Sequence, residues 1–226
     1  MIKSFLISIS FSTLLFSAQQ IVLVIADDFN ASKAKLSCFE GKKQVCSDID
    51  VNLGKNGLGW GIGIKEIVHA KGEPIKKEGD KRAPAGVFRL SNTFGYSYTP
   101  LSRKMPYLYT DKNLICVDDS NDPFYNQIIE ANGNEKSFEF MRRKDMQYKY
   151  GVTVEHNLKA QAQRGSCIFL HIQKAPNHPT VGCTSMREED LKKVIEWLDK
   201  KKEPILIQVP SSYLPAVQQY YPQIRE

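Results

Sequence analysis

Only one stretch of this chain has the spacing of a long amphipathic helix, and this restricts the folds open to it more than any other feature. Four apolar residues share one face of a helix predicted over residues 188–201: Leu191, Val194, Ile195 and Leu198. Ser185-x-x-Glu188 has the pattern of a capping box at its start, and Pro204 ends it. Elsewhere the apolar runs are short and rich in β-branched residues, which predicts strands. We therefore expect a mostly β protein with one or more helices.

The strands are expected along most of the chain. They are predicted over residues 21–26, 34–39, 45–51, 87–90, 114–117, 151–155, 166–172 and 205–209. Residues 118–150 are predicted as loops with one short helix over residues 141–148. This middle part has too few apolar residues for a core of its own, so we interpret it as an insertion. A chain of 226 residues is long enough for one well-cored domain, which we expect over residues 19–226.

The first eighteen residues differ from the rest of the chain. Lys3 is followed by a mostly apolar run up to Phe16, and the small residues Ser17 and Ala18 come next. This pattern predicts a secretory signal peptide over residues 1–18, with an uncleaved N-terminal anchor as the alternative. No later stretch is apolar enough to cross a bilayer. We therefore expect an exported protein of the periplasm or cell envelope, without stable membrane insertion after cleavage.

The charge of the chain is moderately positive. Lys and Arg outnumber Asp and Glu by 31 to 25, a net charge of +6. Such a balance suits a weakly anionic polymer. The basic residues are too scattered for a nucleic-acid partner, which requires clustered Lys and Arg. No nucleic-acid partner is expected, and we expect a monomer.

The chain has five cysteines, and export would place them in an oxidising compartment. An odd number leaves at least one thiol without an intramolecular partner. Cys38 and Cys46 can close a small loop, and Cys116 and Cys167 can also pair, but sequence spacing does not decide the connectivity. Cys183 is the cysteine whose neighbours suggest chemistry.

The segment around Cys183 combines several groups that covalent catalysis needs. His171 ends an apolar strand, and a proline-bearing loop leads from it to Gly182 and Cys183. We expect a helix to begin at Thr184 and Ser185, so that its N-terminus lowers the pKa of the Cys183 thiol. The backbone N–H groups of Gly182, Cys183 and Thr184 are candidates for holding an oxyanion. Cys183 is thus the candidate nucleophile and His171 its base.

Two other interpretations of these residues stay open. Cys183 can be a buried structural cysteine and His171 a core histidine. A metal site from His171, His178, Cys183 and Cys167 is the other. The sequence has no C-x-x-C or H-x-x-x-H pair, so no metal is expected, and no organic cofactor is implied.

The pattern His171 … Thr180-x-Gly182-Cys183-Thr184 resembles the signature of the L,D-transpeptidase (YkuD-like) family. Residues 82–88, Arg-x-Pro-Ala-Gly-Val-Phe, are similar to the Pro-x-Gly-x-Phe hairpin of that family, and the similarity covers nearly the whole mature chain. The resemblance implies a β-sandwich with a short helix behind the cysteine and an elaborated middle insertion.

The resemblance also implies a reaction. Cys183 would attack the carbonyl of the third stem-peptide residue of peptidoglycan, and His171 would take the thiol proton and protonate the leaving amine. Attack on the acyl-enzyme by an amine would give a crosslink, and attack by water would give carboxypeptidase activity. An L,D-carboxypeptidase or amidase, and a wall-binding module without activity, are the alternatives to a transpeptidase.

The sequence departs from the commoner family pattern at two positions beside the cysteine. Val181 stands where many members have His, and Ser185 where many have an Arg or Asn that binds a substrate carboxylate. Arg82 or Arg164 is a candidate for the missing positive charge. The candidate substrate-binding residues are Thr180, Ser185, Arg82 and His156.

Overall fold

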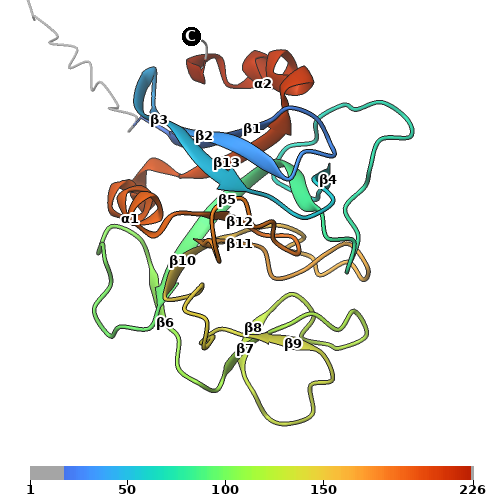
Figure 1. The fold of residues 1–226 in the computed structure, drawn as a ribbon, viewed down its shortest axis with the longest axis vertical. Helices are drawn as coiled ribbons and strands as arrows, with labels where there is room; N and C mark the ends of the chain where they lie inside the picture. The colour runs from blue at the N-terminus through green and yellow to red at the C-terminus, as the bar shows by residue number, and fades with distance from the viewer. Residues whose placement is uncertain (1–17, 225–226) are drawn as a thin grey trace, which may run out of the picture.

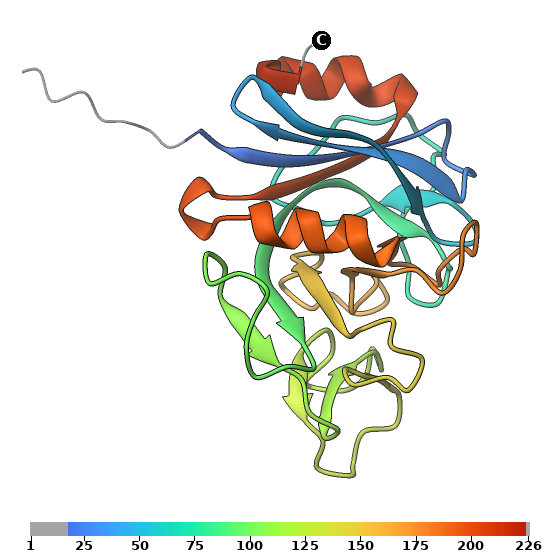
Figure 2. The same ribbon diagram turned by 60° about the vertical axis from the view of Figure 1, so that its left-hand side comes forward.

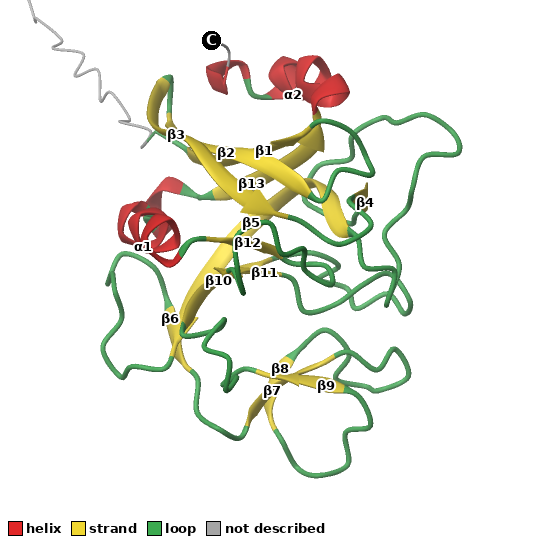
Figure 3. Ribbon diagram, viewed as in Figure 1, coloured by secondary structure: helices red, strands yellow, loops and turns green. Residues whose placement is uncertain are grey.

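The computed structural model describes residues 18–224; residues 1–17, which hold nearly all of the predicted signal peptide, lie outside this range. The strands are β1 (Gln20–Ala26), β2 (Lys33–Glu40), β3 (Lys43–Asn52), β4 (Leu58–Trp60), β5 (Ala83–Gly95), β6 (Tyr107–Tyr109), β7 (Leu114–Val117), β8 (Ile128–Glu130), β9 (Phe138–Phe140), β10 (Tyr150–Val154), β11 (Phe169–Ile172), β12 (Thr184–Met186) and β13 (Ile205–Pro210). The helices are α1 (Glu188–Trp197) and α2 (Leu214–Tyr220), with 3₁₀ turns at Lys200–Lys202, Ser211–Tyr213 and Pro222–Ile224. Figures 1 and 3 show their arrangement.

The large sheet folds back on itself through the long strand β5. Its strand order is β10-β11-β12-β3-β2-β1-β13-β5-β4. Residues 86–89 of β5 pair with β13, while residues 90–95 of the same strand pair with β10. Because β5 lies next to one end of this path and also pairs with β10 at the other end, the sheet encloses a core between two layers. This confirms the mostly β, sandwich-like fold expected from the sequence.

Apolar side chains of the central strands and of both helices form one continuous hydrophobic cluster. Strand β13 is buried along its whole length and runs parallel to β1, with Ile21 opposite Ile205. Helices α1 and α2 lie on opposite sides of the layer of β1, β2 and β3 (Figure 2). Leu191 of α1 and Val217 of α2 are fully buried in the core cluster. Among the described residues, no helix is both long and apolar enough to span a membrane.

A small second sheet extends the molecule at one end (Figure 1). Strands β8, β7 and β9 form it, in that order. The sequence predicted β7, but β8 and β9 lie within residues 118–150, where we expected loops and one helix, so that prediction is wrong for these two strands. A disulfide joins Cys116 of β7 to Cys167, just before β11 of the large sheet. Another disulfide joins Cys38 to Cys46 across the β2–β3 hairpin. The second sheet is thus fastened covalently to the segment that leads into β11.

Two predictions about helices are wrong. Residues 184–186 form strand β12 instead of the start of a helix, since they pair with both β11 and β3. Helix α1 begins at Glu188 with Arg187 as its N-cap, and no side chain caps it, so the capping box of Ser185 does not form. The helix predicted over residues 141–148 is absent, and bends and turns occupy that segment.

Candidate active site

Cys183 lies directly before β12, where the chain enters the sheet beside β11. It is the free cysteine among the five, all of which the structure describes, and its side chain is buried. Its sulfur accepts a hydrogen bond from the backbone N–H of Phe169 at 3.4 Å and donates one to the carbonyl of Cys167 at 3.4 Å. The thiol is therefore held against the strand that carries His171.

His171 is buried near the end of β11, with a fixed ring orientation. Its Nδ1 lies 2.8 Å from the carbonyl oxygen of Ile172, which can only accept a hydrogen bond. A neutral ring therefore carries its proton on Nδ1 and keeps the lone pair of Nε2 free. Tyr148 packs edge-on against the imidazole, with ring centroids 5.2 Å apart. This tautomer is the one that a proton acceptor needs.

Burial determines the charge of both groups. It raises the pKa of the Cys183 thiol to about 12, with a further rise from the nearby carboxyl of Glu139. Burial also lowers the pKa of His171 to about 4. Our expectation of a helix N-terminus that lowers the thiol pKa is therefore wrong: a strand follows Cys183, and desolvation dominates. At neutral pH Cys183 is therefore a thiol and His171 a neutral imidazole, so the thiol must lose its proton as it reacts.

Two cavities meet at Cys183. One, of about 200 Å³, is lined by both Cys183 and His171. The other, of about 190 Å³, is lined by Cys183 and Gly182 together with Lys76. Both cavities also share Val181, whose side chain is 71% exposed at their rim. Reactants can therefore approach the sulfur from two sides.

Thr180 shapes the turn before the cysteine. Its hydroxyl donates to the Cys183 carbonyl at 2.6 Å and accepts from the Gly182 N–H at 3.1 Å. The Gly182 N–H thus already has a partner within the turn. The Thr184 side chain is buried and donates to Gln208 at 2.6 Å, which fastens β12 to β13. Of the three predicted oxyanion donors, the N–H groups of Cys183 and Thr184 remain candidates.

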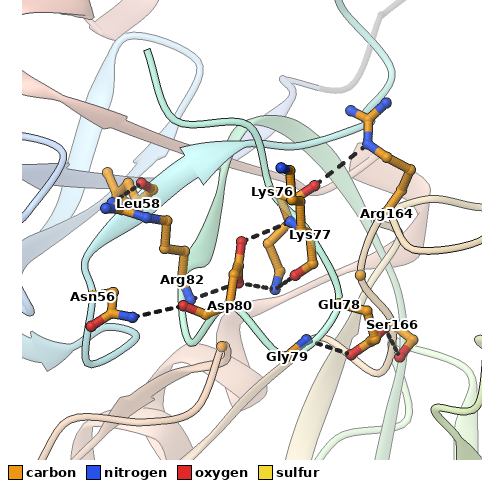
Figure 4. A network of polar contacts seen from close by, with 12 residues as sticks. Asn56, Leu58, Lys76, Lys77, Glu78, Gly79, Asp80, Arg82, Arg164 and Ser166 are labelled. Carbon is orange, nitrogen blue, oxygen red and sulfur yellow. Dashed lines mark hydrogen bonds and ion pairs between the residues drawn. The ribbon is translucent and has the colours of Figure 1, made fainter. Parts of the chain in front are cut away.

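A polar network, shown in Figure 4, supports the second cavity and includes a residue that sequence reasoning missed. Lys76 is only 3% exposed and donates to Asp80 at 2.6 Å and to the Lys77 carbonyl at 2.8 Å. Its ammonium nitrogen lies 3.9 Å from the point that a Cβ on Gly182 would occupy. Its only signal in the sequence is its position a few residues before the Arg-x-Pro-Ala-Gly-Val-Phe segment of residues 82–88.

The arginines proposed from sequence serve other contacts. Arg82 donates from Nη1 to the carbonyls of Phe29 and Leu58, at 2.9 and 2.7 Å, so its guanidinium fastens backbone segments together (Figure 4). Arg164 reaches the Lys76 carbonyl at 3.4 Å and lines a different cavity, beside Trp60. Neither guanidinium lines a cavity that contains Cys183.

His156 and Ser185 are both buried away from these cavities. The Nδ1 atom of His156 accepts from the Ile62 N–H at 3.2 Å, and its Nε2 lies 2.9 Å from the Arg164 carbonyl. Burial lowers its pKa to about 4, so the ring is a neutral bridge between loops. The Ser185 hydroxyl is buried without a hydrogen-bond partner. Neither side chain lines a cavity with Cys183.

Glu139 and Tyr148 are further residues that the sequence did not indicate. Glu139, from β9, lines both cavities, and Tyr148 donates a hydrogen bond of 2.6 Å to its carboxylate. Tyr148 shares a buried cluster with Cys183. Both residues come from the middle insertion, where no motif marks them.

One of the ligands proposed for the alternative metal site is not available. Cys167 is bonded to Cys116 and cannot bind a metal as a thiolate. Within residues 18–224, no group of three or more His, Cys, Asp or Glu side chains is placed to hold a metal ion. The described side chains around Cys183 instead suit acyl transfer, in which a thiol attacks a carbonyl carbon and an imidazole takes the thiol proton.

Comparison with known proteins identifies the family of the chain. No curated protein and no solved structure matches the chain. A family model, described as the L,D-transpeptidase catalytic domain, matches residues 28–207, which include both His171 and Cys183. Because this match spans most of the 226 residues, the chain belongs to the L,D-transpeptidase catalytic domain (YkuD) family.

Proposed function

We propose that the protein is an exported peptidoglycan L,D-transpeptidase, with Cys183 as its nucleophile and His171 as its base. One observation carries the proposal: the free thiol and an imidazole with an available Nε2 line the same cavity of about 200 Å³. Family membership supplies the substrate class, which is the stem peptides of peptidoglycan. Without Lys3 of the predicted signal peptide, the net charge of +6 becomes +5, which suits an anionic wall polymer.

The first half-reaction forms a thioester. His171 takes the thiol proton at Nε2 as the sulfur attacks the carbonyl carbon of the third stem residue, because the thiol is not ionised beforehand. The resulting imidazolium then gives this proton to the amine of the leaving D-amino acid. The N–H groups of Cys183 and Thr184 are the proposed donors to the oxyanion.

The second half-reaction decides the product. An amine of a second stem peptide reaches the thioester through one cavity while the donor chain occupies the other, and its attack gives a crosslink. Attack by water gives a shortened stem instead. Two cavities that meet at Cys183 favour the transfer between two peptides over simple trimming.

Intact-protein mass spectrometry tests the proposal directly. The mature chain is incubated with tetrapeptide stem fragments, and the soluble products are analysed alongside. We expect an adduct that maps to Cys183, together with crosslinked dimers. Cys183→Ala should form neither, and His171→Gln should form the adduct at least about a hundredfold more slowly, the usual contribution of a general base.

The other outcomes separate the alternatives. An adduct with shortened tripeptides and no dimers would make the protein a carboxypeptidase. Wall binding that Cys183→Ala retains, without any adduct in the wild type, would make it a binding module. A carbapenem, which would acylate an active thiol as the stem peptide does, gives an independent probe of Cys183. Fractionation of cells tests the export that we propose.

A further inference from the structure

Glu139 occupies a position that the steps above leave without a role. It lies on β9 of the small sheet, yet its carboxyl group lines both cavities that meet at Cys183. Within residues 18–224, Val181 and Cys183 itself are the only other residues that line both. A group that enters from either side to reach the sulfur therefore passes this carboxyl.

A hydrogen bond from Tyr148 holds the carboxyl group of Glu139 in place. The buried Tyr148 donates to its Oε2 at 2.6 Å, and the same ring packs against His171. The disulfide between Cys116 and Cys167 ties the small sheet to the strand that leads to His171, and Cys116 stands opposite Glu139 in the strand register. Glu139, Tyr148, His171 and Cys183 are thus parts of one connected arrangement.

An acidic group at this position works against the nucleophile. The negative charge of Glu139 raises the pKa of Cys183 and so disfavours the thiolate. The charged and titratable groups that act on Glu139 are Asp118, Glu78, Arg143 and Tyr148. The Oδ1 atom of Asp118 is buried without a hydrogen-bond partner, and Asp118 lines the cavity next to Lys76. The lining of that cavity holds the carboxyl groups of Glu78, Asp118 and Glu139 and the ammonium groups of Lys76 and Lys81, so acidic groups outnumber basic ones there by one.

The acyl acceptor is a cationic reactant. A stem-peptide amine is an ammonium ion at neutral pH, and it must lose a proton before its nitrogen can attack. A carboxyl group whose pKa is raised by burial, as that of Glu139 is, takes up this proton more readily than an exposed one. Glu139 lies at the wall along which the amine approaches the thioester.

We propose that Glu139 accepts the proton that the incoming ammonium must lose, and thereby directs the acyl group to an amine rather than to water. This inference rests on the proposed function. The carboxylate takes one proton from the ammonium, and the nitrogen lone pair forms the new N–C bond while the C–S bond breaks. The second amine proton passes through Nε2 of His171 to the sulfur of Cys183. Glu139 then returns its proton to solvent.

The test measures how one acyl-enzyme divides between two products. Wild type and Glu139→Gln are acylated with the same tetrapeptide donor at a fixed acceptor concentration, and crosslinked and hydrolysed products are counted. We expect the ratio of crosslink to hydrolysis, counted per acyl-enzyme formed, to fall by about tenfold or more near neutral pH. Removal of the Glu139 charge also lowers the pKa of Cys183, so the acylation rate is measured separately and should not fall. Glu130→Gln, an exposed carboxylate on β8 of the same sheet, should leave the ratio unchanged.

Two measurements distinguish proton transfer from a structural role. The ratio for Glu139→Gln should recover as the pH approaches the pKa of the acceptor amine, where neutral amine is present without a base. The defect should also vanish with an acceptor whose amine is already neutral at the assay pH. Glu139→Asp, which keeps the carboxylate one methylene further back, should give an intermediate ratio and serves as the readout if Glu139→Gln does not fold.

Several results would overturn the inference. An unchanged ratio in Glu139→Gln, or a ratio that stays low at every pH and with every acceptor, would exclude a role in proton transfer. An equal loss of acylation and of crosslinking would place Glu139 in the first half-reaction. If the wild type forms no Cys183 adduct at all, the proposed function fails. If the adduct forms but the Glu139→Gln variant gives the wild-type ratio of crosslinked to hydrolysed product, only the inference about Glu139 fails.

Discussion

Asp80 accepts a hydrogen bond from the buried ammonium of Lys76 at 2.6 Å, and the same carboxylate binds the backbone N–H groups of Lys77 and Arg82, at 2.7 and 2.9 Å. One side chain thus fastens both ends of the loop that forms a wall of the second cavity. The Lys76 side chain is 3% exposed and that of Asp80 is 17% exposed, so water screens this ion pair only weakly. The shape of the cavity beside Gly182 depends on the pair.

Replacing Asp80 by Asn should destabilise the protein strongly. The substitution leaves the Lys76 ammonium buried without its counter-charge, which typically costs about 3 kcal/mol in the free energy of unfolding. Urea denaturation measures the change. The control is Asp50→Asn, which breaks the pair with Lys35 at 2.8 Å, where both side chains are largely exposed. We expect no measurable change there, and equal effects of the two substitutions would contradict our account of burial.

The alkylation rate of Cys183 should report a thiol that is neutral at rest. With a pKa of about 12, the thiolate fraction is small at neutral pH and rises about tenfold for each pH unit up to that value. Iodoacetamide labelling followed by mass spectrometry gives the profile. In denaturant the same thiol should titrate near its ordinary value of 9.0, because the desolvation is lost. A labelling rate that is high and flat below about pH 8 would instead show a preformed thiolate–imidazolium pair.

The free energy of unfolding should fall as the pH drops below the ordinary pKa of histidine. Burial lowers the pKa values of His156 and His171 from 6.5 to about 4, so the unfolded chain binds more protons in this window. The stability contribution of each neutral ring is complete above pH 6.5 and is lost as the pH falls to about 4, and it amounts to about 3 kcal/mol per ring. Chemical denaturation at several pH values measures this slope. In the variant His156→Gln, the free energy of unfolding should change less steeply with pH. A slope identical to that of the wild type would contradict the assigned pKa of the His156 ring.

The two disulfides should differ in their effect on stability. Cys116 and Cys167 are 51 residues apart in sequence, while Cys38 and Cys46 are 8 apart. Loop-closure entropy then predicts that the free energy of unfolding falls by about 4 kcal/mol when Cys116 and Cys167 are both replaced by alanine. The same replacement of Cys38 and Cys46 should lower it by about 2.5 kcal/mol. Thermal unfolding of the two variants compares them. Only removal of the disulfide between Cys116 and Cys167 should also slow acylation, because it releases the small sheet from the Cys183 region.

Ser185→Ala should be harmless or slightly stabilising. The Ser185 hydroxyl is buried without a partner, so its removal relieves a desolvation cost, with a gain of up to about 1 kcal/mol. The acylation rate should be unchanged, since Ser185 lines neither cavity. Thr153→Val removes a second unpartnered hydroxyl, on β10, and provides a matched comparison. A marked loss of acylation in Ser185→Ala alone would restore the substrate-binding role that its sequence position suggested.

The local pattern of apolar residues was sufficient to predict most strands and helix α1. It failed at residues 184–186, where Ser185-x-x-Glu188 has the form of a helix cap. Pairing of Thr184 with Leu170 and of Met186 with Val51 draws this segment into the sheet instead. These partners are distant in sequence, so no local pattern contains them. The same error gave the wrong direction for the shift of the Cys183 pKa, because a helix N-terminus after the cysteine would have lowered it.

The candidate site was predictable only where it is local. His171, Gly182 and Cys183 lie within one short segment, and their residue types suggest acyl transfer. Glu139 and Tyr148 reach the cysteine through the pairing of β7 with β9 and through a disulfide that the sequence left open. Lys76 looks like a surface lysine in sequence, and only the fold buries it. Residues brought in by tertiary contacts carry no signature that one sequence can show.

The place of β13 in the sheet determines when this chain can fold. Residues 205–210 are inserted between β1 and β5, and they pair with residues 21–26, which are synthesised some 180 residues earlier. Until β13 leaves the ribosome, the edges of β1 and β5 have no partner, and the two halves of the core cannot close over each other. Closure of the core is therefore a late step with high contact order, because it waits for residues that are made some 180 positions after β1.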